Sequence, residues 1–257
     1  MAFVKNKYNR KGQLTIWIIV ALIIVVSITI VFVFKNRLSL EKEDQFSPQT
    51  YMQECIKKTI DDALLLMLPQ GGFVSPKVYK LYNDTKIEYL CLNSGYFNTC
   101  RMQHPALFNE MESEINNFSY SRIDSCYESL KAELEKRNAA VQTGELEINT
   151  SILPGKVSMT VNKTFFITQQ ESSSSYNSFQ IETRTNLYEL ARTMIEIGNQ
   201  EAKYCYFEYL GYMILYPEID IRKDSLSEDT KIYTLTYKKT GERTRTAIRG
   251  CAIPAGI

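Results

Sequence analysis

The hydrophobic pattern of the chain begins with 21 consecutive residues, Leu14 to Phe34, that carry no charge. An α-helix of this length rises ~31 Å, about the thickness of the hydrocarbon core of a bilayer. A secretory signal has a shorter apolar core and a cleavage site of small residues after it, whereas this stretch ends in Phe32–Val33–Phe34. We therefore expect a retained transmembrane helix over residues 13–35, preceded by a basic leader over 1–12 and followed by a charged stalk over 36–46.

Helical spacing dominates the next hundred residues. Apolar residues recur every three or four positions between Met52 and Met67, which predicts an amphipathic helix that begins at Pro48. Its opposite face carries paired lysines and aspartates, which we interpret as a solvated face and not as a site. Two more helices are expected, Pro105 to Asn117 and Ser121 to Arg137. A hairpin of Ile87–Leu92 with Tyr96–Thr99 is expected before them, and residues 47–143 form the mainly helical part of the body.

From residue 144 onward, apolar residues occur at every second position, which is the spacing of a β-strand with one buried face. Alternation on both sides of Leu153–Pro154–Gly155 predicts a hairpin with one buried face. The run Gln169 to Asn177 contains four consecutive serines and is expected to be a solvent loop before a third strand. Asn186 with Glu189 resembles a capping box for a helix over Leu187 to Ile197, and a further helix is expected to reach about Leu210.

A final hairpin of Ile232–Tyr237 with Arg243–Ile248 closes the pattern, so residues 144–257 combine an antiparallel sheet with helix. Strands and helices that come in runs indicate an α+β fold with an antiparallel sheet, because a parallel sheet would need alternating strands and helices. The extramembrane body is expected to have a helical half and a sheet half.

Charge separates the N-terminal segment from the body. Residues 1–37 hold six basic and no acidic residues, which leaves 24 basic and 29 acidic residues in 38–257, a net charge of −5. A nucleic-acid binder needs a clustered basic face, so this body is not expected to bind nucleic acid. The expected partners are the membrane, through a single span, and protein partners or further copies of the chain.

The six cysteines all lie after the apolar stretch, and we interpret them as disulfides of an extracytoplasmic body. The expected pairs are Cys55–Cys126, Cys91–Cys100 and Cys205–Cys251. A metal site, a catalytic thiol and buried free thiols remain as alternatives, although the chain has no Cys-x-x-Cys motif. Glycosylation sequons occur on the same side of the stretch and favour a cytoplasmic N-terminus. They begin at Asn83, Asn117, Asn149 and Asn162.

Catalytic signatures are scarce. His104 is the single histidine, and we interpret it as an ordinary surface or half-buried residue. The sequence has no phosphate loop, dinucleotide fingerprint or Gly-x-Ser-x-Gly motif, so no catalytic residue, metal ligand or cofactor is assigned and an enzyme is not expected. Tyrosines are abundant between Tyr204 and Tyr216, and this cluster is the candidate for a binding surface.

The junction Lys11–Gly12–Gln13, a short basic leader followed directly by the apolar helix, resembles the class III signal of archaeal type IV pilin-like proteins. The resemblance implies that a prepilin-type peptidase cuts between Gly12 and Gln13 and that the helix remains as an anchor and assembly core. Many pilins carry a glutamate at the fifth residue after the cut, where this chain has Trp17.

Further stretches, including Gln70–Gly71–Gly72 and Cys251–Ala252–Ile253–Pro254, resemble a group of uncharacterised archaeal single-pass surface proteins. This resemblance implies topology and no chemistry. The chain is therefore expected to be a single-pass protein of the cell membrane with an extracytoplasmic body of unknown activity. A surface or pilin-like structural role is the first expectation, a partner- or ligand-binding ectodomain with a tyrosine-rich surface is the alternative, and an anchored enzyme comes third.

Overall fold

The computed structural model describes residues 10–39, 47–93, 95, 98–169, 172–227 and 229–250. The chain divides into two compact units, Met1–Ser47 and Pro48–Ile257. The first unit contains helix α1 (Arg10–Ser39), whose described side chains, 17–32, are all exposed. Over the described ranges, no helix meets the length and hydropathy needed for a membrane crossing. The span expected at residues 13–35 remains a prediction.

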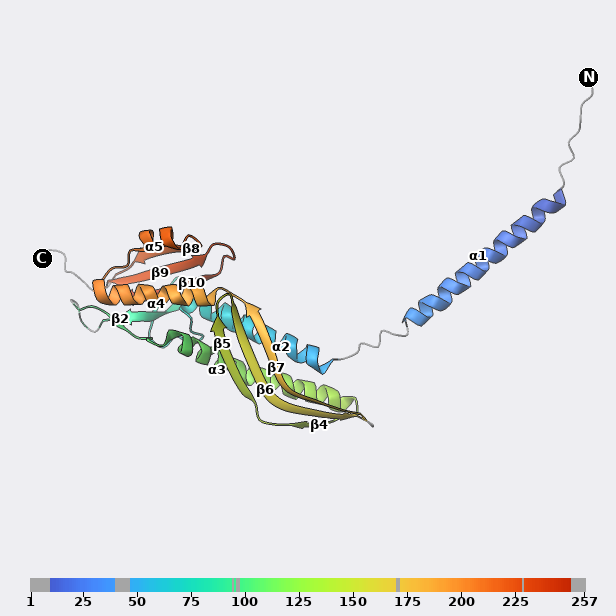
Figure 1. Ribbon diagram of the computed structural model, residues 1–257, viewed down its shortest axis with the longest axis horizontal. Helices are drawn as coiled ribbons and strands as arrows, with labels where there is room; N and C mark the ends of the chain where they lie inside the picture. The colour runs from blue at the N-terminus through green and yellow to red at the C-terminus, as the bar shows by residue number, and fades with distance from the viewer. Residues whose placement is uncertain are drawn as a thin grey trace, which may run out of the picture. The chain divides into compact units, whose positions relative to one another are not determined.

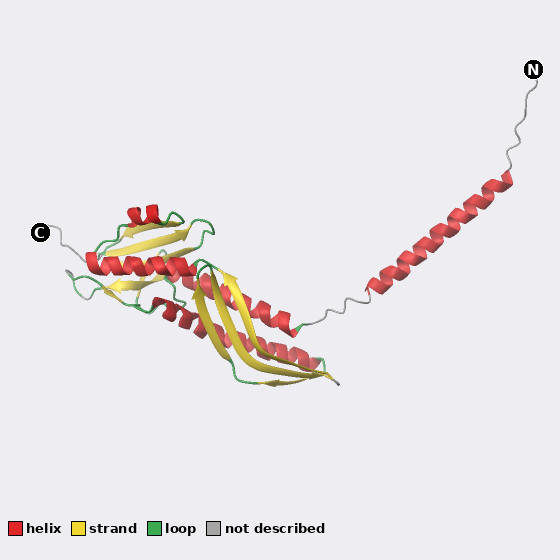
Figure 2. Cartoon of the chain, viewed as in Figure 1, coloured by secondary structure: helices red, strands yellow, loops and turns green. Residues whose placement is uncertain are grey.

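The second unit is a mixed α+β body, which confirms the predicted class of fold (Figures 1 and 2). Its helices are α2 (Pro48–Met67), the short 3-10 helix η1 (Leu68–Gln70), α3 (Leu107–Lys136), α4 (Leu187–Tyr204) and α5 (Tyr209–Leu215).

One sheet has six strands in the order β1-β2-β10-β9-β8, with β3 paired to β2. The pairing of β2 with β10 is parallel, and the remaining pairs of this sheet are antiparallel. The strands are β1 (Tyr79–Tyr82), β2 (Thr85–Leu92), β3 (Arg101–Met102), β8 (Ile219–Ser225), β9 (Thr230–Tyr237) and β10 (Arg243–Arg249).

The other sheet is antiparallel, with β6 paired to β4 and β5 along one edge and to β7 along the other. Its strands are β4 (Ala140–Thr143), β5 (Glu147–Leu153), β6 (Lys156–Gln169) and β7 (Ser172–Arg184). Helices α2 and α3 pack against each other and against this sheet, as Figure 1 shows. Alternate residues of β6 such as Val161 and Phe165 are buried in this layer.

Helix α4 lies across one face of the six-stranded sheet (Figure 1) and buries Leu190, Met194 and Ile197 there. The opposite face has its own apolar cluster, built from Ile87, Tyr89, Ile232 and Ala247, against which Tyr82 packs. The β1–β2 hairpin turns at Asn83 and Asp84, which both have positive φ angles (47° and 58°). The hydroxyl of Tyr82 reaches Asp224 on β8, at the far edge of the sheet, so the hairpin tip lies over this second face.

The predicted break between two helices at residues 118–120 is wrong, because α3 is continuous through it. Ser119 is fully buried and continues the stripe from Ile115 to Ile123 at a spacing of four. A polar residue on the apolar face therefore did not interrupt the helix, since packing of that face against α2 outweighs its weak propensity.

The serine-rich run is not a loop. Ser172 to Ser175 belong to β7 and pair with the end of β6, where their small side chains are exposed. The predicted capping box is also absent: Asn186 makes no side-chain cap, and its backbone N–H donates to Glu242. The strand expected at Tyr96–Thr99 lies partly outside the described residues, and β2 pairs on that side with β3.

Candidate functional site

A polar concavity of the body lies on the face of the six-stranded sheet that is turned away from α4. Lys231 and Tyr233 of β9 contact Glu201 of α4. Side chains alternate between the two faces of a strand, so the even-numbered residues of β9, and the residues paired with them on β8 and β10, lie on the face away from α4. The register places them in rows across β8, β9 and β10. These rows are Asp220–Thr236–Arg243 and Arg222–Thr234–Arg245.

The tip of the β1–β2 hairpin covers part of this face and forms a groove of about 360 Å³. Polar side chains dominate its lining, which we call the arginine groove. It consists of Tyr82, Asn83, Asp220, Arg222, Asp224, Thr234, Thr236, Arg243 and Arg245.

In the arginine groove, Asp224 has a hydrogen-bond partner, whereas the arginines have no ion pair with a described residue. Asp224 accepts a hydrogen bond of 3.0 Å from Tyr82, and this bond, with burial and the charge of Asp224, raises the pKa of Tyr82. Arg245 lies 5.9 Å from the centre of the Tyr82 ring. Within the described residues, the three arginines of the groove form no ion pair at 4.0 Å or less. Their guanidinium groups keep their donors available to an anion.

A second pocket of about 320 Å³ lies on the other face of β2, where the chain enters α3. His104 is at its centre: Nδ1 lies 2.5 Å from Glu110 and Nε2 lies 3.3 Å from Glu88. The Nε2 contact is an ion pair without hydrogen-bond geometry. Glu88 is buried and accepts the backbone N–H groups of Lys77 and Val78.

The charge state of His104 is set by these carboxylates. Burial by itself lowers the pKa of the imidazole, but the contacts with Glu88 and Glu110 outweigh it, and the pKa is raised. No hydroxyl or thiol of the described residues is hydrogen-bonded to His104. The described ranges also contain no cluster of three or more His, Cys, Asp or Glu side chains suited to a metal ion.

Two predicted disulfides are confirmed. Cys55 of α2 is bonded to Cys126 of α3, with Cα atoms 6.5 Å apart, and Cys91 of β2 is bonded to Cys100, with Cα atoms 5.4 Å apart. Cys205 is disulfide-bonded as well, and its expected partner Cys251 lies outside the described residues.

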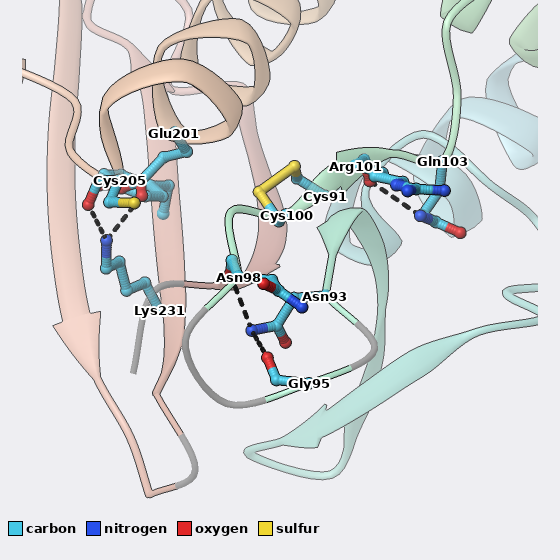
Figure 3. The surroundings of a disulfide bond; sticks show 11 residues. Cys91, Asn93, Gly95, Asn98, Cys100, Arg101, Gln103, Glu201, Cys205 and Lys231 are labelled. Carbon is cyan, nitrogen blue, oxygen red and sulfur yellow. Dashed lines mark hydrogen bonds and ion pairs between the residues drawn. A yellow bond between two sulfur atoms is a disulfide. The ribbon is translucent and has the colours of Figure 1, made fainter. Parts of the chain in front are cut away.

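Figure 3 shows the Cys91–Cys100 disulfide beside the end of α4. Lys231 of β9 donates to the buried carboxylate of Glu201 at 2.6 Å and to the carbonyl of Cys205 at 2.8 Å. Tyr233 also donates to Glu201, and burial together with this bond raises its pKa. We interpret this fully engaged network as a structural clamp between α4 and β9.

The predicted tyrosine surface is only partly a surface. Tyr204 and Tyr206 are 62% and 45% exposed, but Phe207 is completely buried, and the rings of Tyr212 and Tyr216 pack at a tilt with centroids 4.5 Å apart. The aliphatic side chains of α5, not tyrosines, are the most exposed apolar groups nearby, with Ile214 at 80%.

All four sequon asparagines are exposed. Asn117 lies on α3, and Asn149 and Asn162 lie on adjacent strands of the second sheet. Asn83 is at the hairpin tip and lines the arginine groove. The candidate cleavage point, Gly12 and Gln13, lies near the start of α1.

Of the residues that line the two pockets, the sequence singled out His104, as an ordinary histidine, and Asn83 and Asn117, as sequons, but none of them as part of a binding site. Arg243 and Arg245 share one face of a predicted strand, which was an available signal, but Arg222 and Tyr82 lie on strands that the sequence pattern did not predict. Comparison with known family models, curated proteins and solved structures finds no match for the chain.

Proposed function

We propose that the chain is a membrane-anchored extracytoplasmic protein whose body binds an anionic ligand in the arginine groove. The observation that carries the proposal is the set of three arginines, Arg222, Arg243 and Arg245, gathered in one groove without an ion pair among the described residues. Guanidinium groups in protein structures are usually matched to carboxylates, because their donors are arranged for bidentate bonds to planar or tetrahedral anions.

The test is isothermal titration calorimetry, in which the folded protein is titrated with acetate or with sulfate at low ionic strength. Charge-assisted hydrogen bonds contribute about 1.5–3 kcal/mol each, so Arg245→Gln should weaken anion binding by about 10- to 100-fold.

Arg184→Gln is the matched control, because Arg184 is exposed on β7 in the other sheet and does not line the groove. It should leave the affinity unchanged. If Arg245→Gln and Arg184→Gln weaken binding equally, the anion is held by nonspecific charge attraction and not by the groove. If the unaltered protein binds neither anion, the proposal is refuted.

Membrane anchoring rests on the uncharged stretch Leu14 to Phe34. The described side chains of α1 in this stretch are exposed, and large exposed apolar surfaces require a lipid or protein environment. The extracytoplasmic location of the body is supported by the disulfides, since cytoplasmic thiols are kept reduced. The proposal does not include an enzymatic activity.

A pilin-like structural role is the second candidate. It is favoured by the leader Lys11–Gly12 placed directly before the apolar helix. In this case the helix would be the assembly core, and the arginine groove could still bind a ligand on the assembled surface. The two functions therefore differ in what the N-terminal segment does.

A further inference from the structure

The arginine groove contains acids as well as arginines, and their balance restricts the ligand. Three arginines and two aspartates leave the lining with a net charge of +1. Asp224 is engaged by Tyr82, whereas Asp220 has no ion pair or hydrogen bond among the described residues. A ligand with two negative charges would meet a free carboxylate at Asp220, whereas a ligand with one negative charge matches the net charge of the lining.

The arginines and aspartates are also arranged in a definite order. In the register of the sheet, Arg222 and Arg245 flank Thr234 on neighbouring strands. Side chains directly opposite on adjacent strands have Cβ atoms about 5 Å apart, so two long arginines on either side of a threonine can reach one anionic group between them. This row can serve as the anion-binding end of the groove.

The adjacent row supplies acceptors for neutral donors. Asp220 lies across from Thr236, two residues along each strand from the row of Arg222. The free carboxylate can accept hydrogen bonds from the hydroxyl groups of a ligand, and the neighbouring threonine hydroxyl can donate to them or accept from them. Tyr82 gives the groove an aromatic wall, against which the apolar face of a sugar ring can pack.

We propose that the arginine groove binds a sugar acid with one carboxylate, a hexuronate or a related monoanionic sugar. Arg222 and Arg245 hold the carboxylate, and Asp220 and Thr236 hold ring hydroxyls. The inference rests on the proposed anion-binding function and adds the class of ligand. A neutral sugar would leave the arginines unpaired, and an inorganic anion would leave Asp220 without a partner.

The test compares three probes by calorimetry: D-glucuronate, acetate and D-glucose. The full chain is used in a detergent that has no sugar headgroup, because such a headgroup would compete for the groove. We expect glucuronate to bind at least tenfold more tightly than acetate and glucose to show no measurable binding.

Variants separate the two ends of the groove. Arg222→Gln should weaken glucuronate and acetate alike, by tenfold or more. Asp220→Asn should lower the affinity for glucuronate by about fivefold or more, but leave the affinity for acetate unchanged or slightly higher. Thr236→Val should also lower the affinity for glucuronate and spare that for acetate. Circular dichroism melting curves show whether each variant is folded.

The outcomes distinguish the inference from the proposed function. If acetate or sulfate binds through Arg222 but glucuronate binds no more tightly than acetate, the anion site stands and the sugar-acid ligand is excluded. Equal binding of glucose and glucuronate would overturn the inference as well, because the carboxylate would then be irrelevant. If none of the anions binds, both proposals fail.

Discussion

The charge of His104 depends on contacts that the fold brings together. Its two ring nitrogens face Glu88 from β2 and Glu110 from the first turn of α3, and Phe73 packs on the ring with centroids 4.4 Å apart. Because both carboxylates favour the imidazolium form, the pKa of His104 is raised above its ordinary value near 6.5.

This raised pKa makes the stability of the body depend on pH. The stabilising contribution is complete below pH ~6.5 and is lost as the pH rises through the raised pKa of the folded state. We expect the free energy of unfolding to fall across this range, and to fall less in His104→Gln. Urea unfolding at pH 6 and pH 9 measures both. If the free energy of unfolding falls by the same amount in His104→Gln and in the unaltered protein, another group is responsible.

At the scale of single residues, the sequence could suggest one half of each pocket. Glu110 follows His104 by six residues, and Arg243 and Arg245 alternate on one strand. Glu88 and Arg222 could not be assigned, because their contributions depend on which strands pair and in what register. A single-residue shift of β8 would turn Arg222 to the opposite face of the sheet.

At the scale of elements, the two described disulfides close chain segments of very different length. Cys55–Cys126 links residues 71 apart, whereas Cys91–Cys100 links residues 9 apart. In the chain-entropy account the longer closure restricts the unfolded state more, which gives roughly 4 kcal/mol of stabilisation against roughly 2.5 kcal/mol.

The corresponding double variants test this difference. We expect Cys55→Ala/Cys126→Ala to lower the free energy of unfolding by more than Cys91→Ala/Cys100→Ala. Guanidinium unfolding without reductant provides the comparison. The unaltered protein in excess reductant, which also loses the disulfide of Cys205, gives the lower limit with every cross-link absent. Equal losses, or the reverse order, would mean that local packing of the cysteines determines their contribution.

Sequence periodicity identified most elements but not their ends. The alternation around Pro154–Gly155 correctly predicted the hairpin of β5 and β6, because one face of these strands is buried. It failed for Ser172 to Ser175, where the strand is held by backbone pairing with β6 and its side chains carry no burial signal. Helix α3 was predicted in two pieces, although the buried stripe Ile115, Ser119 and Ile123 runs through the expected break.

At the scale of the whole molecule, the α+β class follows from the order of the elements, whereas the division into two sheets does not. The parallel pairing of β2 with β10 joins segments more than 150 residues apart, and no local pattern indicates it. The groove depends on this pairing, since β10 supplies Arg243 and Arg245 and β2 supports the hairpin that covers them.

The N-terminal segment gives a prediction at this scale. We expect the full chain to be recovered with membranes, and a chain that begins at Ser47 to be recovered in the soluble fraction with its disulfides formed, because residues 48–257 form their own compact unit. If the helix is also an assembly core, the N-terminus of the mature protein will be Gln13. A mature N-terminus at Met1 or Ala2 in a monomeric protein would exclude the pilin-like role.

The position of Asn83 has a practical consequence for any such experiment. The asparagine is exposed at the hairpin tip, lines the arginine groove and begins the sequon Asn83–Asp84–Thr85. An oligosaccharide attached there would stand at the entrance of the groove and obstruct it. Protein made in a host that glycosylates would then differ in ligand affinity from protein made in a host that does not, although the two would have the same sequence and the same fold. The choice of expression host is thus an experimental variable in its own right, and Asn83→Gln is the variant that removes it.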